Sequence, residues 1–122
     1  MKKVTFLICF VFAGLVSMAQ DGIAKFKETK HDFGKVKLDH PATNKFVFTN
    51  TSNKPLIIET ATASCGCTTP EYPKKPILPG KSAEVSATFN AANVGHFDKS
   101  VTVKFANVDQ PVILVITGDV VK

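Results

Sequence analysis

The sequence lacks arginine and tryptophan and contains a single tyrosine among its 122 residues. Arginine forms the bidentate hydrogen bonds that hold phosphates, and aromatic rings stack on nucleic-acid bases. A chain without these residue types does not carry the usual footprint of a nucleic-acid-binding protein. Its 15 basic residues are all lysines, and most stand singly along the chain. We therefore interpret them as a solvated surface and expect no nucleic acid among the partners.

Long apolar runs are scarce too, and the clearest one lies at the N-terminus. There Lys2 and Lys3 precede an almost wholly apolar run from Val4 to Val16, and the small residues of Ser17-Met18-Ala19 follow it. This order is typical of an export signal over residues 1–19, with cleavage before Gln20. The run is shorter than the roughly 20 residues that cross a bilayer, so we expect no transmembrane segment in the mature chain. The protein is accordingly predicted to be exported, to the periplasm or to the cell surface.

Removal of residues 1–19 would leave 122 − 19 = 103 residues, which suit one domain over residues 20–122 with a core of its own. Apolar residues recur there with a period of two, which predicts half-buried strands, and helical spacing is not evident. The expected strands are residues 24–28, 31–36, 44–51, 55–63, 82–90, 97–106 and 111–121. About seven short strands separated by turn residues predict an all-β fold, an antiparallel β-sandwich of two sheets.

The alternation also predicts which side chains face the core. The expected core-facing residues are Phe46, Phe48, Val85, Ala87, Phe89, Val101, Val103 and Phe105. The last strand differs, because Val112 to Ile116 is apolar on both faces. We expect this strand to be central or covered, since on an open edge it would be a docking site for another chain. Asn50-Thr51-Ser52 matches an N-glycosylation motif, but we interpret it as part of the turn toward Pro55.

Several short motifs occur in an order that is similar to that of one known family. His31-Asp32-Phe33-Gly34-Lys35-Val36 comes first, Ser64-Cys65-Gly66-Cys67-Thr68 lies in the middle, and Leu114-Val115-Ile116-Thr117-Gly118 comes last. With residues 46–51, 54–58 and 77–82 between them, the chain resembles the exported bacterial domain-of-unknown-function family 1573 over essentially its whole mature length. The resemblance implies an immunoglobulin-like sandwich, similar to domains of larger cell-surface and scaffold proteins. It implies no reaction and no catalytic residue.

Any chemistry of this chain should centre on Cys65 and Cys67, because the third cysteine, Cys9, lies in the predicted export signal. Residues i and i+2 of an extended strand are roughly 6.6 Å apart, near the upper end of the about 4.4 to 6.8 Å that a disulfide spans. Gly66 would act as the hinge that brings the two cysteines together. A bridge this short should stabilise the fold little. Three interpretations stay open: a local disulfide or inert thiols, a metal site, or a redox pair.

As metal ligands, two thiolates on one face would suit copper(I), or would supply half of a tetrahedral zinc site. Further ligands would have to be imidazoles that the fold brings close, and His31 and His96 are the candidates. For each of them a position on the surface or in a loop is the ordinary alternative. We expect no cofactor, with copper or zinc as the alternative.

The sequence shows no hydrolase signature, no phosphate-binding glycine loop and no pair of carboxylates that could be placed together, so we do not expect an enzyme. It favours a non-enzymatic binding or structural module of the bacterial envelope. Such a module would present its turns or a strand edge to an envelope protein or a glycan. The alternative is a soft-metal or thiol-redox protein that uses Cys65-Gly66-Cys67.

Overall fold

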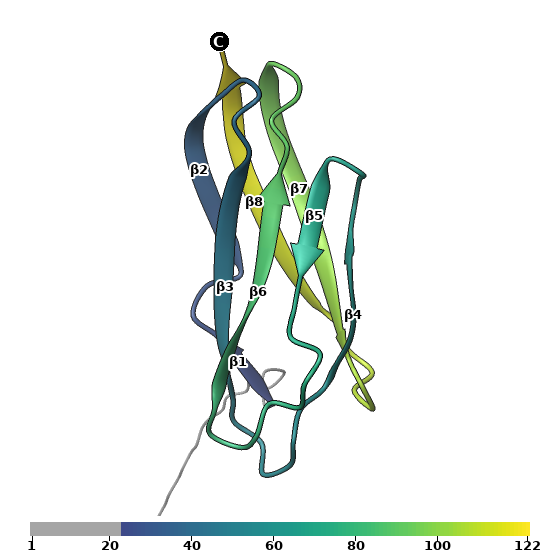
Figure 1. Cartoon of the computed structure of the whole chain (residues 1–122). Coiled ribbons are helices and arrows are strands. Elements are labelled where there is room, and N and C mark those ends of the chain that lie inside the picture. Colours follow the sequence, from purple (N-terminus) through teal and green to yellow (C-terminus); the bar gives the residue numbers. More distant parts are fainter. Residues whose placement is uncertain (1–22) are drawn as a thin grey trace, which may run out of the picture.

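The computed structural model describes residues 23–122, which form two β-sheets packed face to face (Figure 1). This part of the chain contains eight strands and no helix, and so no helix that could cross a membrane. The strands are β1 (Ala24–Phe26), β2 (Lys30–Lys37), β3 (Ala42–Asn50), β4 (Ile58–Ala63), β5 (Thr68–Glu71), β6 (Ser82–Phe89), β7 (Gly95–Phe105) and β8 (Val112–Val121). The predicted export signal and its cleavage site lie outside the described residues.

Each sheet has four strands, in the orders β1-β3-β6-β5 and β2-β8-β7-β4. The predicted immunoglobulin-like sandwich is therefore confirmed. All strand pairs are antiparallel except one, because β2 runs parallel to β8 with Lys30 opposite Val115. A parallel pair was not predicted from the sequence. It arises because the chain leaves the first sheet after Phe26 and joins the second at Lys30 without reversing its direction (Figure 1).

Two strands differ from the prediction. The stretch predicted as one strand over residues 55–63 is a strand only from Ile58 onward, and Leu56 before it forms an isolated bridge with Ile77. The short strand β5 was not predicted, because it contains Pro70 and follows the cysteine pair closely. Proline cannot donate to a neighbouring strand, but edge strands tolerate it, and β5 is the edge of its sheet.

The core lies between the two sheets, and the eight side chains predicted to face it are at most 6% exposed. Two aromatic pairs join the sheets across this core. Phe48 of β3 lies 5.7 Å from Phe105 of β7, measured between ring centroids, and Phe89 of β6 stacks on Phe97 of β7 at 3.9 Å. Burial of large apolar side chains from both sheets is the dominant favourable contribution to such a fold.

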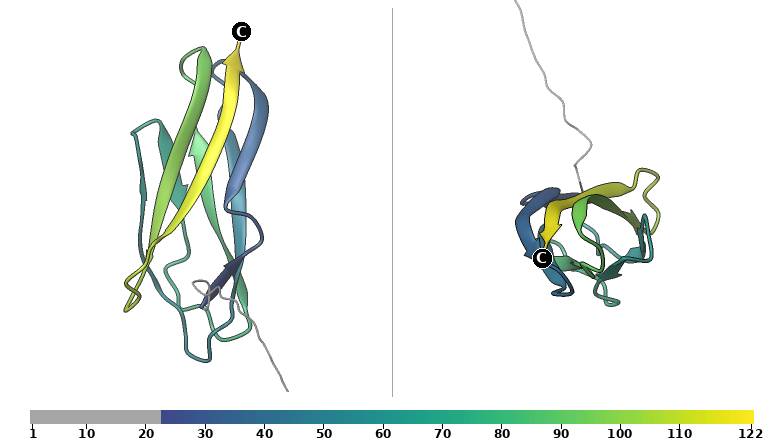
Figure 2. Two further views of the ribbon diagram at one scale, coloured as in Figure 1. Left: turned by 180° about the vertical axis from the view of Figure 1, so that it is seen from behind. Right: turned by 90° about the horizontal axis from the view of Figure 1, so that it is seen from above.

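The last strand, β8, is central, as predicted. It lies between β2 and β7, and Figure 2 shows it flanked on both sides when the molecule is seen from behind. Leu114 and Ile116 are almost fully buried, whereas Ile113 on the opposite face is exposed. The first residues of β8 have a neighbour on one side only, because the β2–β8 register begins at Val115.

Asn50 is a fully buried polar residue at the end of β3. Its Nδ2 donates to the carbonyl oxygens of Lys54 (2.8 Å) and Ile77 (2.7 Å), and its Oδ1 accepts from the backbone N–H (2.9 Å) and the hydroxyl (2.7 Å) of Ser52. Buried amides need such partners to offset the loss of water. The side chain holds the turn that follows β3, in agreement with the turn interpretation, and its amide is not free for glycosylation.

Candidate functional site

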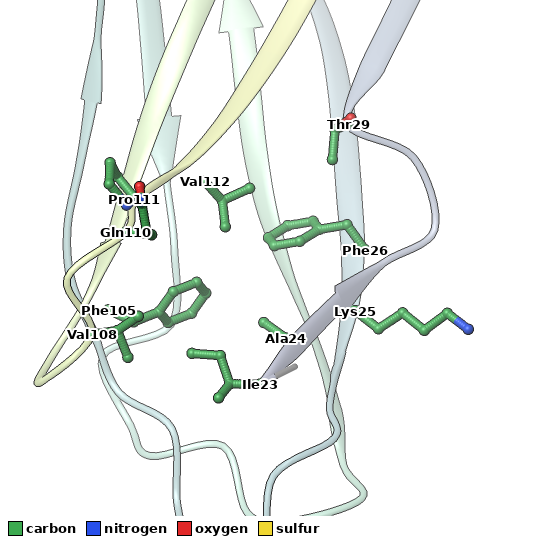
Figure 3. A pocket seen from close by; sticks show the side chains of 10 residues that line it. All are labelled: Ile23, Ala24, Lys25, Phe26, Thr29, Phe105, Val108, Gln110, Pro111 and Val112. Carbon is green, nitrogen blue, oxygen red and sulfur yellow. The ribbon is translucent and has the colours of Figure 1, made fainter. Parts of the chain in front are cut away.

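An apolar groove opens where β1 lies near the start of β8 (Figure 3). We call it the β1–β8 groove, and its volume is about 690 Å³. Its lining residues are Ile23, Ala24, Lys25, Phe26, Thr29, Phe105, Val108, Gln110, Pro111 and Val112. In Figure 3 the side chains of Ile23, Phe26, Phe105 and Val112 point toward a common space, whereas Lys25 points away from it. The interior of the groove is therefore apolar.

Two incomplete strand pairings leave this groove open. On one side, β1 is an edge strand of three residues. On the other side, β2 joins β8 only from Val115, whose N–H donates to the carbonyl oxygen of Thr29 (2.8 Å). Backbone N–H groups of alternate residues point to the same side of a strand, so the N–H of Ile113 points to that side too. Within residues 23–122, no strand pairs with Ile113 on this side of β8.

Three lysines lie in and directly after β1, near one side of the groove. Lys25 belongs to β1, Lys27 follows it and Lys30 begins β2, and all three are exposed. Glu28 is the acidic residue among them, and its carboxylate lies 3.3 Å from Nδ1 of His31. We call the three lysines the basic rim. It places a net positive charge beside an apolar interior.

The cysteine pair lies in the corner between β4 and β5, at the upper right in Figure 1, where the chain passes from one sheet to the other. The sulfur atoms of Cys65 and Cys67 are at bonding distance, and their Cα atoms are 5.3 Å apart. A turn, not an extended strand, brings them together. Both residues are partly exposed, and Cys67 packs against the hydrophobic core.

Hydrogen bonds that do not involve sulfur hold this corner on both sides of the pair. The N–H of Ser64 donates to the carbonyl oxygen of Ser100 (2.8 Å), and the hydroxyl of Ser64 accepts from the N–H of Ser100 (3.1 Å). The carbonyl oxygen of Cys67 accepts from the N–H of Asn90 (3.0 Å). Thr68, which follows, is buried and begins β5. The backbone of the corner is therefore fixed independently of a bridge between the cysteines.

Gly66, between the two cysteines, lies in open surroundings. Its φ is outside the left-handed region, and a Cβ added to it would meet no residue other than its two chain neighbours within 4 Å. Neither backbone conformation nor lack of space therefore demands glycine here, and its role as a hinge stays a prediction. The pair is approachable from solvent because both cysteines are partly exposed and Gly66 is exposed.

The candidate histidine ligands have other partners. His31 on β2 lies beside Glu28 and places its ring 4.8 Å from that of Phe33, edge to face. His96 on β7 has its Nδ1 3.0 Å from Oδ1 of Asp119. His96 and Cys67 do line one small hollow of about 150 Å³, but residues 23–122 contain no group of three or more side chains placed to hold a metal ion. Copper or zinc binding therefore stays a prediction, and the described residues do not bring a set of ligands together for it.

Sequence reasoning did not find the β1–β8 groove. Its lining comes from the ends of strands and from the connection between β7 and β8, which carry no motif. The one available signal was the apolar start of the last strand. From the sequence, docking was considered only for the case in which the whole strand lies on an open edge. The structure confines the free edge to the residues before Val115.

Comparison with known proteins agrees with this fold. The family model described as "Protein of unknown function (DUF1573)" matches residues 24–120. The chain belongs to this family. The resemblance inferred from the sequence is thereby confirmed, and the match spans the cysteine pair and every lining residue of the β1–β8 groove except Ile23. No curated protein matches the chain in sequence.

Solved structures share the fold of this DUF1573 domain at low identity. A protein of unknown function from Porphyromonas gingivalis W83 superposes with a TM-score of 0.69 at 10% identity, over 97% of this chain and 54% of that chain. The PapD-like domain 7 of human CEP192 gives 0.63 at 10% identity, over 94% and 99%. The Vibrio cholerae VesB protease gives 0.63 at 16% identity, over 81% and 32%. The chain thus spans about a third of the protease and about half of the Porphyromonas protein, and these likenesses show the fold alone.

Proposed function

We propose that this domain is a non-enzymatic binding module of the bacterial envelope that takes up an extended segment of a partner protein in the β1–β8 groove. The observation that carries the proposal is the apolar groove beside the unpaired side of β8. A segment lying along Val112 and Ile113 would meet unpaired backbone groups and would bury alternate side chains in the groove, as in strand addition. The location in the envelope rests on the export signal expected over residues 1–19.

The groove and its rim suit a segment that is apolar at alternate positions and acidic at its ends. The apolar interior would accept the first feature, and the basic rim would attract the second. Opposite charges across an interface speed encounter and help to fix the register. A glycan fits less well, because specific recognition of a polar ligand needs convergent polar groups. Lys25, Thr29 and Gln110 are the polar members of the lining, and Lys25 faces away.

The lining also supports a role without catalysis. Among its ten described residues Lys25 is the single ionisable side chain, and it points to solvent. Acid–base and nucleophilic catalysis both need a reactive side chain within reach of the bound substrate. The groove offers shape, apolar surface and backbone hydrogen bonds, which are the elements of binding.

Replacement of Ile113 by proline tests the proposal. Proline removes the N–H that points to the open side of β8 and leaves the hydrogen bonds to β7 in place, because that N–H does not face β7. The matched control is Ile113→Ala, which shortens the same exposed side chain and keeps the N–H. The probe is a synthetic peptide of alternating valine and threonine with two glutamates at each end. We expect Ile113→Ala to bind it like the wild type and Ile113→Pro to lose at least about tenfold in affinity, measured by fluorescence anisotropy.

Thermal melting of both variants shows whether the fold is kept, and a peptide with lysines in place of the glutamates tests the basic rim. At low salt we expect the lysine peptide to bind more weakly than the glutamate peptide. At high salt the two affinities should become equal. Equal binding to both Ile113 variants would rule out strand addition at this edge. Binding of an envelope glycan, with no binding of the peptide, would show that the partner class is wrong.

A further inference from the structure

The cysteine corner is a second site, distant from the β1–β8 groove, and it has a chemistry of its own (Figure 1). We propose that Cys65 and Cys67 form a thiol–disulfide exchange site for a protein dithiol, in which Cys65 carries the mixed disulfide and Cys67 is the resolving thiol. This inference goes beyond the binding function of the groove and does not depend on it.

The fold does not need the bridge between Cys65 and Cys67. A bridge between Cys65 and Cys67 encloses one residue, so it restricts the unfolded chain very little. The hydrogen bonds from Ser64 to Ser100 and from Asn90 to Cys67 hold the corner in place without it. A disulfide that contributes little to the fold, and that opens without disturbing it, is suited to reversible chemistry.

The bridge is accessible to the thiol of another protein. Disulfide exchange needs a thiolate to reach a sulfur atom along the line of the S–S bond. Both cysteines are partly exposed and Gly66 between them is exposed, and a Cβ added to Gly66 would meet no residue other than its two chain neighbours within 4 Å. An incoming thiol of another protein therefore meets the bridge at the surface of a corner and not at the bottom of a cleft.

The two sulfur atoms have different surroundings, which gives them different roles. Cys67 packs against the core and its carbonyl oxygen is held by Asn90, so its position is fixed when the bridge opens. Cys65 lies outside the core cluster and is the sulfur that can move outward. The N–H of Cys67 points at Sγ of Cys65 (3.2 Å), and the hydroxyl of Thr68 lies 3.9 Å from the same sulfur. Such donors stabilise a thiolate, which favours Cys65 as the attacking group in the reduced pair.

The surroundings of Cys67 suit the resolving role. Cys67 lines a hollow together with Lys99 and His96, and Asp119 is the carboxylate that lies against His96. A lysine ammonium near this hollow favours the thiolate that Cys67 becomes when it leaves the bridge. The hydroxyl of Thr68, 3.8 Å from Sγ of Cys67, adds a donor on the other side.

The exchange proceeds in two steps. One thiolate of the partner dithiol attacks Sγ of Cys65, the bond between Cys65 and Cys67 breaks, and Cys67 takes the electron pair as a thiolate. The second thiol of the partner, as a thiolate, then attacks the partner sulfur of the mixed disulfide and releases Cys65. The two protons of the partner thiols end on Cys65 and Cys67. In sum the pair is reduced by two electrons and the partner dithiol is oxidised to a disulfide, and the reverse sequence oxidises the pair.

The experiment uses the full chain carrying Cys9→Ala, with glutathione as the probe. In this background Cys67→Ser leaves the Cys65 thiol alone, and Cys65→Ser is the matched variant that leaves the Cys67 thiol alone. Each variant is mixed with oxidised glutathione, and formation of the mixed disulfide is followed by intact mass over time. We expect the Cys65 thiol to react at least about tenfold faster than the Cys67 thiol, because it is more accessible and its thiolate has the closer N–H donor.

The Cys9→Ala protein with both cysteines provides the second readout. Excess reduced glutathione should open the bridge, oxidised glutathione should close it again, and the melting temperature should change by only a few degrees between the two states. A bridge that resists the same excess of reduced glutathione would overturn the exchange site, since structural disulfides of exported proteins behave in that way. Equal rates for the two single-cysteine variants, or a faster reaction of Cys67, would overturn the assignment of roles.

Discussion

Replacing Asn50 by alanine should strongly destabilise this domain, although the residue lies in neither candidate site. The alanine removes an amide that makes four hydrogen bonds within the buried end of β3. A hydrogen bond within a protein contributes about 1 kcal/mol net, so their complete loss would amount to about 4 kcal/mol.

Two of the partners keep other hydrogen bonds, which reduces this value. The carbonyl oxygen of Ile77 still accepts from the N–H of Leu56 (2.9 Å), and the hydroxyl of Ser52, once Oδ1 is gone, is free to donate to the carbonyl oxygen of Lys54 (3.0 Å). Neither carbonyl is left without a donor, so the expected loss in the free energy of unfolding is about 2 to 4 kcal/mol. For a domain of this size, such a loss lowers the melting temperature by about 10 °C or more.

Urea denaturation followed by circular dichroism measures the change directly. Asn50→Asp is the informative comparison, because it keeps the acceptor for Ser52 but replaces the donor to Lys54 and Ile77 by a carboxylate oxygen. A charge facing two carbonyl oxygens should make this variant at least as unstable as Asn50→Ala at neutral pH. A loss below about 1 kcal/mol in Asn50→Ala, or a milder effect of aspartate than of alanine, would refute the role given to the buried amide.

Two glycines give opposite expectations for the same substitution. Gly118→Ala should lower the free energy of unfolding by about 1 to 3 kcal/mol, because the new Cβ would lie 2.7 Å from Cζ of Phe97 and 2.9 Å from the carbonyl oxygen of Gly34; an unchanged urea midpoint would contradict this contact. Gly66→Ala should change the free energy by no more than about 0.5 kcal/mol and leave the number of titratable thiols as in the wild type, because its surroundings are open; free thiols appearing in this variant alone would show that the bridge needs a glycine hinge.

The alternation of apolar residues was sufficient to predict the sandwich and its core. In β6, Val85, Ala87 and Phe89 point inward as the period of two requires. The parallel pairing of β2 could not be predicted in this way, because parallel and antiparallel strands share the same period. β5 was missed for a different reason, since Pro70 argues against a strand unless its edge position is known.

The sequence predicts the two candidate sites to different extents. The cysteine pair was visible because its residue types are rare in this chain. The surroundings of the pair could not be predicted, because Ser100 and Asn90, which hold the corner, lie in or next to strands far along the sequence. The β1–β8 groove depends on where β1 ends and β2 begins relative to β8. Such relative strand lengths are a property of the assembled sheets, and no local pattern encodes them.

The parallel pairing of β2 with β8 has a mechanical consequence. The chain enters β2 at one end of the sandwich and leaves β8 at the other (Figure 1). Tension applied between Ile23 and Lys122 therefore pulls these neighbouring strands in opposite directions along their length. Their hydrogen bonds are loaded in shear and share the force, instead of opening one after another as in the peeling of a hairpin. Along this direction the β2–β8 pair resists tension through several hydrogen bonds at once.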